Sequence, residues 1–196
     1  MGGAAHYPAF LRLDGKRVLL IGGGAIAARK ARALARCGAL VKLVAPRVGP
    51  AARRAAERVV ERRFQDRDLD GVALAVCATG DEMLNERVSR LCRSRGIWAN
   101  VVDRPRLCDF IVPAVVRRGT LSIAVSSGGA SPFLTRRLRR RLQGLLTPED
   151  ARLAAALRKL RPRLLEMGIV RRRRILAGIA AAGAAGAARE IKRRLS

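Results

Sequence analysis

Short apolar runs alternate with helix-forming stretches through the first half of the chain. The runs are rich in branched apolar side chains, as is typical of parallel strands buried on both faces. They span residues 17–21, 40–44, 58–63, 72–77 and 97–102. Helix formers fill residues 25–37 and 81–95. This alternation predicts right-handed βαβ units in an open parallel sheet, an α/β, Rossmann-like fold over about residues 8–113.

The pattern changes after Pro113. Residues 114–117 and 121–125 are two short apolar segments on either side of a turn at Arg118-Gly119, which predicts a two-stranded ribbon. Helix formers then dominate from Ser131-Pro132, an N-cap and first-turn pair. Helix breaks are expected near Gly144, Thr147-Pro148 and Gly168. The expected domains are a sheet domain over 1–113, a ribbon-and-helix segment over 114–146 and a basic helical domain over 147–196.

A glycine loop joins the first strand to the first helix. In the pattern Gly22-x-Gly24-x-x-Ala27, the first glycine permits a tight turn and the second lets the backbone approach a pyrophosphate. The small Ala27 keeps helix and strand close, and the helix N-terminus offers N–H groups to the anion. A tight turn without a ligand is the alternative, although three consecutive glycines are entropically costly. We therefore predict a dinucleotide-binding domain.

The sequence leaves the choice of dinucleotide open. NAD-binding domains of this kind usually carry a carboxylate at the end of the second strand, where it holds the ribose hydroxyls. Here that region is Val44-Ala45-Pro46-Arg47, without an acid. Arg47 taken alone favours NADP, because an arginine accommodates its additional phosphate.

The chain is strongly basic, with 41 Lys and Arg against 15 Asp and Glu and a net charge of +26. Residues 114–196 carry 20 basic and 4 acidic side chains, so the excess concentrates there. An acidic small-molecule substrate, a nucleic acid and a compositional preference for Arg over Lys could each explain it. Phe133 is the single aromatic residue of this segment, which disfavours nucleic-acid binding by base stacking.

The four cysteines form no CxxC pair, which favours free thiols in a reducing, cytoplasmic compartment. The first ten residues lack the pattern of a signal peptide, and no apolar stretch reaches the roughly 20 residues that span a bilayer. We expect a protein that binds no membrane. The single histidine, His6, is expected at the surface, and no cluster of His, Cys and carboxylates has metal-ligand spacing.

Four stretches in order resemble the dehydrogenase and ferrochelatase module of the sirohaem synthase family. They are YPAFLRLDGKRVLLIGGGAIAARKA at 7–31, AVCATGDEMLNERVS at 75–89, NVVDRPRLCDFIVPA at 100–114 and LSIAVSSGGASPFLTRRLR at 121–139. The resemblance implies oxidation of precorrin-2 to sirohydrochlorin with NAD as cofactor, and in some members ferrous ion insertion. It also implies a homodimer, in which the ribbon and the following helix mediate dimerisation.

The resemblance assigns Ala25, Ile26, Pro46 and Arg47 to the cofactor, in addition to the glycine loop and to the two residues that follow the fourth strand. NAD is expected to contact the glycine loop and residues after the first, second and fourth strands. These are Gly22, Gly23, Gly24, Ala25, Ile26, Pro46, Arg47, Thr79 and Gly80. Ser127 and Gly128 lie in a loop near the substrate, where Ser127 is phosphorylated in some relatives. A turn beside two glycines is the alternative for that serine.

Asp103 matches the catalytic aspartate of the family. A carboxylate just after a parallel strand faces the ligand crevice, where it can accept a proton from the substrate. We expect it to lie across the same crevice as the glycine loop, although a turn cap before Arg104-Pro105 is the alternative. The competing functions are a nucleotide-sensing or nucleic-acid-binding protein on this fold and an NADP-dependent reductase of another acidic substrate.

Overall fold

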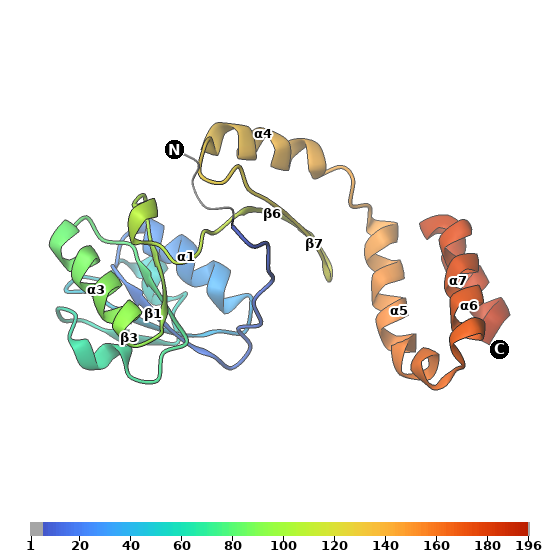
Figure 1. Ribbon diagram of the computed structural model, residues 1–196, viewed down its shortest axis with the longest axis horizontal. Helices are drawn as coiled ribbons and strands as arrows, with labels where there is room; N and C mark the ends of the chain where they lie inside the picture. Colours follow the sequence, from blue (N-terminus) through green and yellow to red (C-terminus); the bar gives the residue numbers. More distant parts are fainter. Residues whose placement is uncertain (1–5, 196) are drawn as a thin grey trace. The chain divides into compact units, whose positions relative to one another are not determined.

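The structure is a computed structural model that describes residues 6–195, apart from the side chains of residues 184, 185, 188, 192, 194 and 195. The chain folds into two compact units, the first ending at Val112 and the second beginning at Pro113. Figure 1 follows the first unit in blue to green and the helices of the second into red. Among the described residues, no helix has the length and apolar character needed to cross a membrane.

A five-stranded parallel sheet forms the centre of the first unit. Its strands are β1 (Arg17–Ile21), β2 (Leu40–Val44), β3 (Arg58–Val60), β4 (Leu74–Cys77) and β5 (Trp98–Val101), in the order β3-β2-β1-β4-β5. The chain builds outward from β1 to β3 and then returns to the other side of β1. The carboxyl ends of β1 and β4 therefore flank the switch point where such sheets bind ligands. The predicted Rossmann-like sheet is confirmed.

Alternate side chains of the strands enter two separate cores. Leu20 and its neighbours pack under α1 (Ala25–Ala35) and α2 (Pro50–Arg53) on one face. Leu19 and its neighbours pack under α3 (Glu82–Ser94) and the short 3₁₀ helix η1 (Asp66–Leu69) on the other. Each fully buried leucine contributes about 2 kcal/mol through removal of apolar surface from water. The sheet is thus buried on both faces, as its continuous apolar strands predicted.

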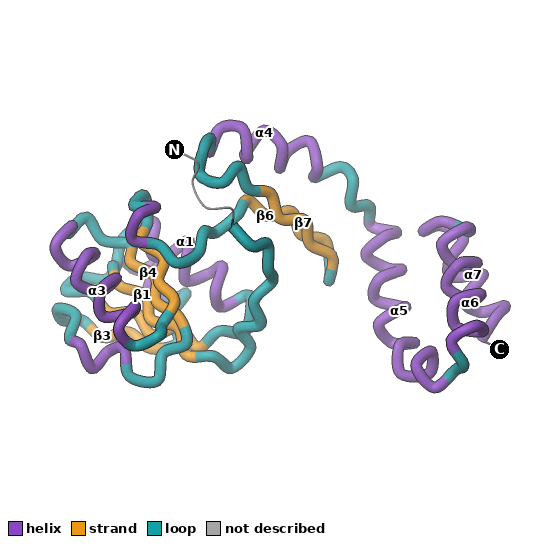
Figure 2. The backbone as a smooth tube through the Cα atoms, viewed as in Figure 1, coloured by secondary structure: helices purple, strands orange, loops and turns teal. Residues whose placement is uncertain are grey.

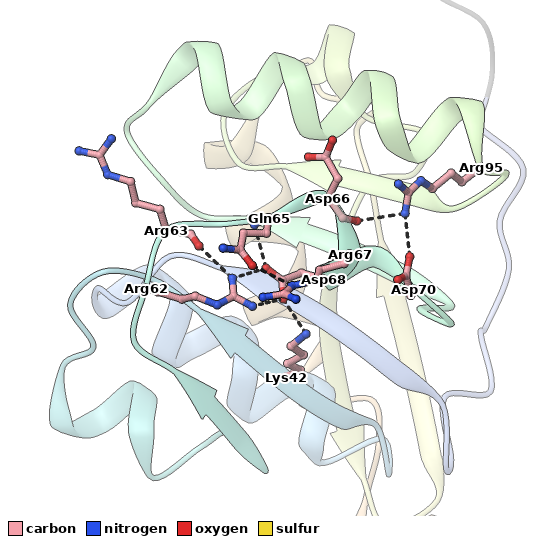
Figure 3. A network of polar contacts seen from close by, with 9 residues as sticks. All are labelled: Lys42, Arg62, Arg63, Gln65, Asp66, Arg67, Asp68, Asp70 and Arg95. Atoms are coloured by element: carbon pink, nitrogen blue, oxygen red, sulfur yellow. Dashed lines mark hydrogen bonds and ion pairs between the residues drawn. The ribbon is translucent and has the colours of Figure 1, made fainter.

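The third strand is shorter than predicted. The expected strand over 58–63 ends at Val60, because Arg62 turns toward the buried carboxylate of Asp68. Lys42 on β2 donates to the same carboxylate at 2.7 Å, and the backbone N–H of Gln65 donates at 2.9 Å. Figure 3 shows these donors converging on Asp68. The short helices α2, η1 and η2 (Pro105–Leu107) were not predicted.

Hydrogen bonds keep the buried Asp68 ionised. Burial by itself raises the pKa of this carboxyl, but the bonds from Arg62 and Lys42 outweigh burial and hold the pKa well below its usual value of 3.8. The carboxylate thereby ties β2, the segment after β3 and η1 together. Because Arg63 and Phe64 lie inside this tied segment, their backbone is fixed next to the sheet edge.

The second unit starts with an antiparallel ribbon of β6 (Ala114–Arg118) and β7 (Leu121–Val125), both of which contact α4 (Pro132–Leu142). Figure 2 separates this ribbon, in orange, from the helices, in purple. The remaining helices are α5 (Pro148–Glu166), α6 (Ile169–Ala181) and α7 (Gly183–Leu195). Apolar residues that include Leu164, Ile175 and Ile179 form their core.

Local sequence signals explain where these helices begin. The Ser131 hydroxyl accepts a hydrogen bond of 3.1 Å from the Leu134 N–H and caps α4. Thr147 and Asp150 form a reciprocal capping box at the start of α5, and Gly168 precedes α6. These three starts were predicted, whereas the break between α6 and α7 at Ala182 was not.

Candidate active site

The glycine turn is packed so closely that side chains would not fit. Gly22 has a φ of +120°, and a Cβ there would lie 2.3 Å from the carbonyl oxygen of Ala78. A Cβ on Gly23 would lie 1.9 Å from the carbonyl oxygen of Arg47. Both glycines therefore let the ends of β2 and β4 approach the turn after β1.

The third glycine has a different role. A Cβ on Gly24 would meet no atom within 4 Å, so the space in front of this residue is open. Gly24 is the N-cap of α1, with no side-chain cap and no acidic residue in the first helical turn. The unpaired N–H groups and positive end of the helix are available to an anion. The loop and helix thus form a cradle for a phosphate.

A cleft of about 710 Å³ opens beside this turn, at the carboxyl ends of the central strands. Five of the predicted cofactor residues line it: Gly22, Gly23, Pro46, Arg47 and Thr79. Gly24, Ala25, Ile26 and Gly80 do not line it. The volume lies within the range of small-molecule and cofactor sites. The cleft fits a dinucleotide whose phosphates lie against the glycine turn.

Residues not predicted from the sequence complete the wall of the cleft. Arg63 and Phe64 come from the segment held by Asp68, and Arg87 comes from α3. The signal that could have found the first two is their position just after the third strand, at the same edge of the sheet as the glycine loop. Figure 3 shows the Arg63 side chain extending away from the Asp68 cluster while Arg62 points into it.

The lining is positively charged. Three arginines line the cleft (Arg47, Arg63 and Arg87) but only one carboxylate, Asp81. Asp81 is the N-cap of α3, and its Oδ1 accepts a hydrogen bond of 3.0 Å from the Leu84 N–H. Arg87 is paired with Asp66 at 2.6 Å. As the sequence predicted, no acid stands at the end of β2 to hold the ribose. The cleft therefore suits a polyanionic ligand through arginines and backbone N–H groups.

Asp103 follows β5, at the same carboxyl edge of the sheet as the glycine loop. It lines a second cavity, of about 280 Å³, together with residues of α3 that include Glu82, Asn85 and Glu86. The reason is topological: Asp103 follows β5, the edge strand, and β4 separates β5 from β1. The two cavities are neighbours, because Asn85 donates a hydrogen bond of 3.2 Å to the backbone carbonyl of Thr79 on the cleft wall.

The backbone of Asp103 is strained. Among the described residues it is the one non-glycine residue with a positive φ, at +60°. Its side chain is exposed, and no described residue donates a hydrogen bond to its carboxylate. The adjacent Arg104 is instead paired with Glu82. Strained residues of this kind persist where the surrounding structure holds them, and they concentrate at functional sites.

Ser127 and Gly128 belong to the second unit, in the turn before α4. The Ser127 hydroxyl accepts a hydrogen bond of 3.0 Å from the Ser131 N–H, and the Gly128 N–H donates to Ser126 Oγ at 3.0 Å. His6 is exposed. Among the described residues, no group of three His, Cys, Asp or Glu could hold a metal ion.

Comparison with known proteins places these features in a family. Residues 9–114 match the model of a putative NAD(P)-binding family, and residues 118–145 match that of the sirohaem biosynthesis protein central region. The chain is 44% identical over 178 residues to a siroheme synthase of Azotobacter vinelandii (strain DJ / ATCC BAA-1303), covering 87% of this chain and 38% of that protein.

Further relatives agree. A siroheme synthase of Pseudomonas aeruginosa (strain UCBPP-PA14) is 43% identical over 164 residues, covering 82% of this chain and 35% of that protein. The chain thus spans little more than a third of the length of these curated relatives. Among solved structures, SirC, a precorrin-2 dehydrogenase, superposes with a TM-score of 0.72 at 28% identity and covers 89% of each chain.

The family prediction made from the sequence is confirmed, and so is the expectation of a nicotinamide dinucleotide cofactor. With its glycine turn, arginine-lined cleft and parallel sheet, the chain belongs to the NAD(P)-binding family of sirohaem biosynthesis proteins.

Proposed function

We propose that this chain oxidises precorrin-2 to sirohydrochlorin with NAD as the electron acceptor. The observation that carries the proposal is Asp103, a strained residue with a free carboxylate at the end of β5, in a cavity next to the dinucleotide cleft. The solved structure to which the chain is similar is named a precorrin-2 dehydrogenase, and the curated relatives are named siroheme synthases.

The cofactor is held by backbone more than by side chains in this proposal. The N–H groups at the start of α1 and the turn at Gly22-Gly23 bind the pyrophosphate. Ala25 and Ile26 are the first two residues of that helix. Pro46 and Arg47 flank one nucleotide, while Thr79 and Gly80 lie after β4 on the other side of the turn. NAD, when bound, supplies the two-electron acceptor of the reaction.

Asp103 acts as the general base. Oxidation of precorrin-2 removes two electrons and one proton to NAD and releases a second proton, which the Asp103 carboxylate accepts. An exposed carboxylate that accepts no hydrogen bond from the described residues is free to take this proton from a substrate. The basic side chains of the second unit, in which Ser127 and Gly128 form the turn before α4, suit the acetate and propionate carboxylates of the tetrapyrrole.

Cofactor choice is part of the proposal. The absence of an acid after β2, together with Arg47 and Arg63 in the cleft, would tolerate the additional phosphate of NADP. We nevertheless favour NAD, because family resemblance supports it. Parallel titration of the protein with NAD and NADP tests this choice, and a tighter Kd for NADP would contradict it.

Two further properties follow from the family. We propose that ferrous ion insertion into sirohydrochlorin is a second activity, with Asp103 taking the pyrrole protons, because the curated relatives are siroheme synthases. Loss of iron insertion in Asp103→Asn tests whether one base serves both activities.

We also propose three functional segments over residues 1–113, 114–146 and 147–196. The second segment joins two copies of the chain into a dimer, which analytical ultracentrifugation tests.

An anaerobic assay tests the main proposal. Wild-type protein, precorrin-2 and NAD should give NADH and sirohydrochlorin in equal amounts, whereas Asp103→Asn should lower kcat by at least about 100-fold. NAD binding should remain unchanged in that variant, because Asp103 does not line the cleft. Glu57→Gln, which removes an exposed carboxylate that lines neither cavity, is the control for charge loss. Unchanged turnover in Asp103→Asn would remove Asp103 from the mechanism.

A further inference from the structure

The edge of β5 is covered by side chains instead of a further strand. On its inner side β5 pairs with β4, which leaves the N–H and C=O groups of Ala99 and Val101 on the outer side. Asp109 covers Ala99, since its N–H donates to the Ala99 carbonyl at 2.8 Å and its Oδ2 accepts from the Ala99 N–H at 2.9 Å. Unpaired edge groups of this kind need such cover.

Cys108 covers Val101 in the same way. Its sulfur accepts a hydrogen bond from the Val101 N–H at 3.2 Å, and its thiol donates to the Val101 carbonyl at 3.1 Å. The carbonyl of Arg104 lies 3.3 Å from the same sulfur as a second acceptor. The thiol therefore contacts the backbone on both sides of Asp103, two residues before it and one residue after it.

The thiol is suited to this role because it stays protonated. Burial is the main cause that raises the pKa of Cys108 above its usual value of 9.0. The hydrogen bond from the Val101 N–H, and after it the charges of Lys30 and Arg93, lower this pKa in part without cancelling the rise. A neutral thiol can donate to one carbonyl and accept from one N–H at the same time. An ionised or oxidised sulfur could not donate.

The rest of the loop is fastened to α3. The Ser89 hydroxyl donates to the Leu107 carbonyl at 3.0 Å, and the Arg93 guanidinium donates to the Arg106 carbonyl at 3.1 Å. These contacts fix the later part of the loop but do not reach Asp103. Its positive φ, which is unfavourable for a residue with a Cβ, is maintained by the neighbouring residues to which the Cys108 thiol is hydrogen-bonded.

We propose that Cys108 is a positioning residue for Asp103: its thiol fastens Val101 and Arg104 and so holds the carboxylate toward the second cavity. This inference rests on the proposed function, in which Asp103 is the general base. It assigns the cysteine neither a redox role nor a ligand. It predicts that removing one sulfur atom weakens catalysis without altering cofactor binding.

Three variants test the inference. Cys108→Ala removes the sulfur and its hydrogen bonds to Val101 and Arg104, which we call the Cys108 clasp. Cys108→Ser keeps a hydrogen-bond donor and acceptor, but on a shorter side chain. Cys92→Ala removes the same atom from a fully buried site on α3, where no hydrogen bond among the described residues joins the thiol to the loop. We expect kcat for precorrin-2 oxidation to fall about 10- to 100-fold in Cys108→Ala, to recover in part in Cys108→Ser and to stay near wild type in Cys92→Ala. The Kd for NAD should be unchanged in all three.

Amide hydrogen exchange gives a readout that does not depend on activity. Exchange at Val101 and Arg104 should accelerate in Cys108→Ala, and exchange at the β1 core should not. Unchanged exchange at these two amides, or a wild-type kcat in Cys108→Ala, would overturn the positioning role. If the wild-type protein does not oxidise precorrin-2 but amide exchange is faster in Cys108→Ala, the proposed function is refuted. The structural role of Cys108 in holding the loop would still stand. An equal loss of kcat in Cys92→Ala would show that the effect is only structural.

Discussion

Lys30 on α1 donates a hydrogen bond of 3.5 Å to Oδ1 of Asn100 on β5. The amide of Asn100 donates in turn to the Phe110 carbonyl at 3.0 Å and lies 3.6 Å from the Cys108 sulfur. An ammonium group is thus held against β5, the strand that ends two residues before Asp103. Burial, followed by repulsion from Arg29, lowers the pKa of Lys30 below 10.5, and attraction to Cys108 and Asp103 offsets part of this decrease.

This burial predicts that Lys30→Met is more stable than wild type. The lowered pKa means that the folded state disfavours the ammonium, so the charge costs stability at neutral pH. We expect the unfolding midpoint to rise by about 2 °C at pH 7. The difference should vanish as pH rises through the folded pKa to 10.5, where the unfolded chain also loses the proton. Thermal unfolding of wild type and Lys30→Met between pH 7 and about 10.5 checks the prediction. Lys16 is exposed, so Lys16→Met is the control and should unfold like wild type.

The positive φ of Asp103 predicts an unusual order of stability for two substitutions. Glycine adopts this conformation without strain, whereas alanine carries a Cβ into it. Asp103→Gly should therefore be about 1 kcal/mol more stable than Asp103→Ala, the reverse of the order expected in ordinary loops. Urea denaturation measures the difference. Both variants should be inactive, and an equal or greater stability of Asp103→Ala would contradict the strained conformation.

The glycine turn predicts opposite behaviour for neighbouring substitutions. Gly23→Ala should unfold more easily, by about 2 kcal/mol or more, because its Cβ would collide with the Arg47 carbonyl. Gly24→Ala should fold normally, since its Cβ meets no atom within 4 Å, but should bind NAD more weakly because the methyl group occupies the phosphate cradle. Calorimetry of NAD binding with thermal unfolding separates the two effects. If Gly24→Ala binds NAD with wild-type affinity, the phosphates of NAD do not bind at Gly24.

The buried Asp68 carboxylate predicts sensitivity to acid. Its lowered pKa stabilises the protein above about pH 4, and this contribution is lost as pH falls toward the folded value. Asp68→Asn should cost about 2 kcal/mol at pH 7, below the range for fully buried pairs because the Lys42 and Arg62 side chains are 28% and 32% exposed. The cost should shrink below pH 4. The Kd for NAD should also rise in Asp68→Asn, because the segment that carries Arg63 and Phe64 loosens. A loss of stability in Asp68→Asn that does not depend on pH would contradict an ionised Asp68 in the folded protein.

Two core thiols predict a loss of stability in alkali. Burial raises the pKa of Cys77 to about 12 and that of Cys92 to about 11, from a usual value of 9.0. Above pH 9 the unfolded chain loses these protons while the folded protein keeps them, so stability falls as pH rises toward 11. Denaturation of wild type and Cys92→Ala between pH 8 and 11 should show a shallower decline in the variant. Parallel declines would mean that Cys92 ionises in the folded protein.

The amino-acid sequence by itself determined the features that depend on neighbours along the chain. Apolar runs of strand length gave the parallel sheet, Ser131 and Thr147 marked helix starts, and the glycine loop between a strand and a helix identified the dinucleotide turn. It also placed Asp103 at a strand end. These predictions succeeded because hydrogen-bonding periodicity and capping are local.

Only the tertiary structure decided how distant segments meet. The sequence did not show that Arg63 and Phe64 join the glycine turn in one cleft, because a buried Asp68 sets their position. It also could not show that Asp103 faces a second cavity, since this follows from β4 lying between β1 and β5. The strain at Asp103 and its clasp by Cys108 arise from contacts across the loop. Such contacts depend on packing in three dimensions, for which a single sequence carries no periodic signal.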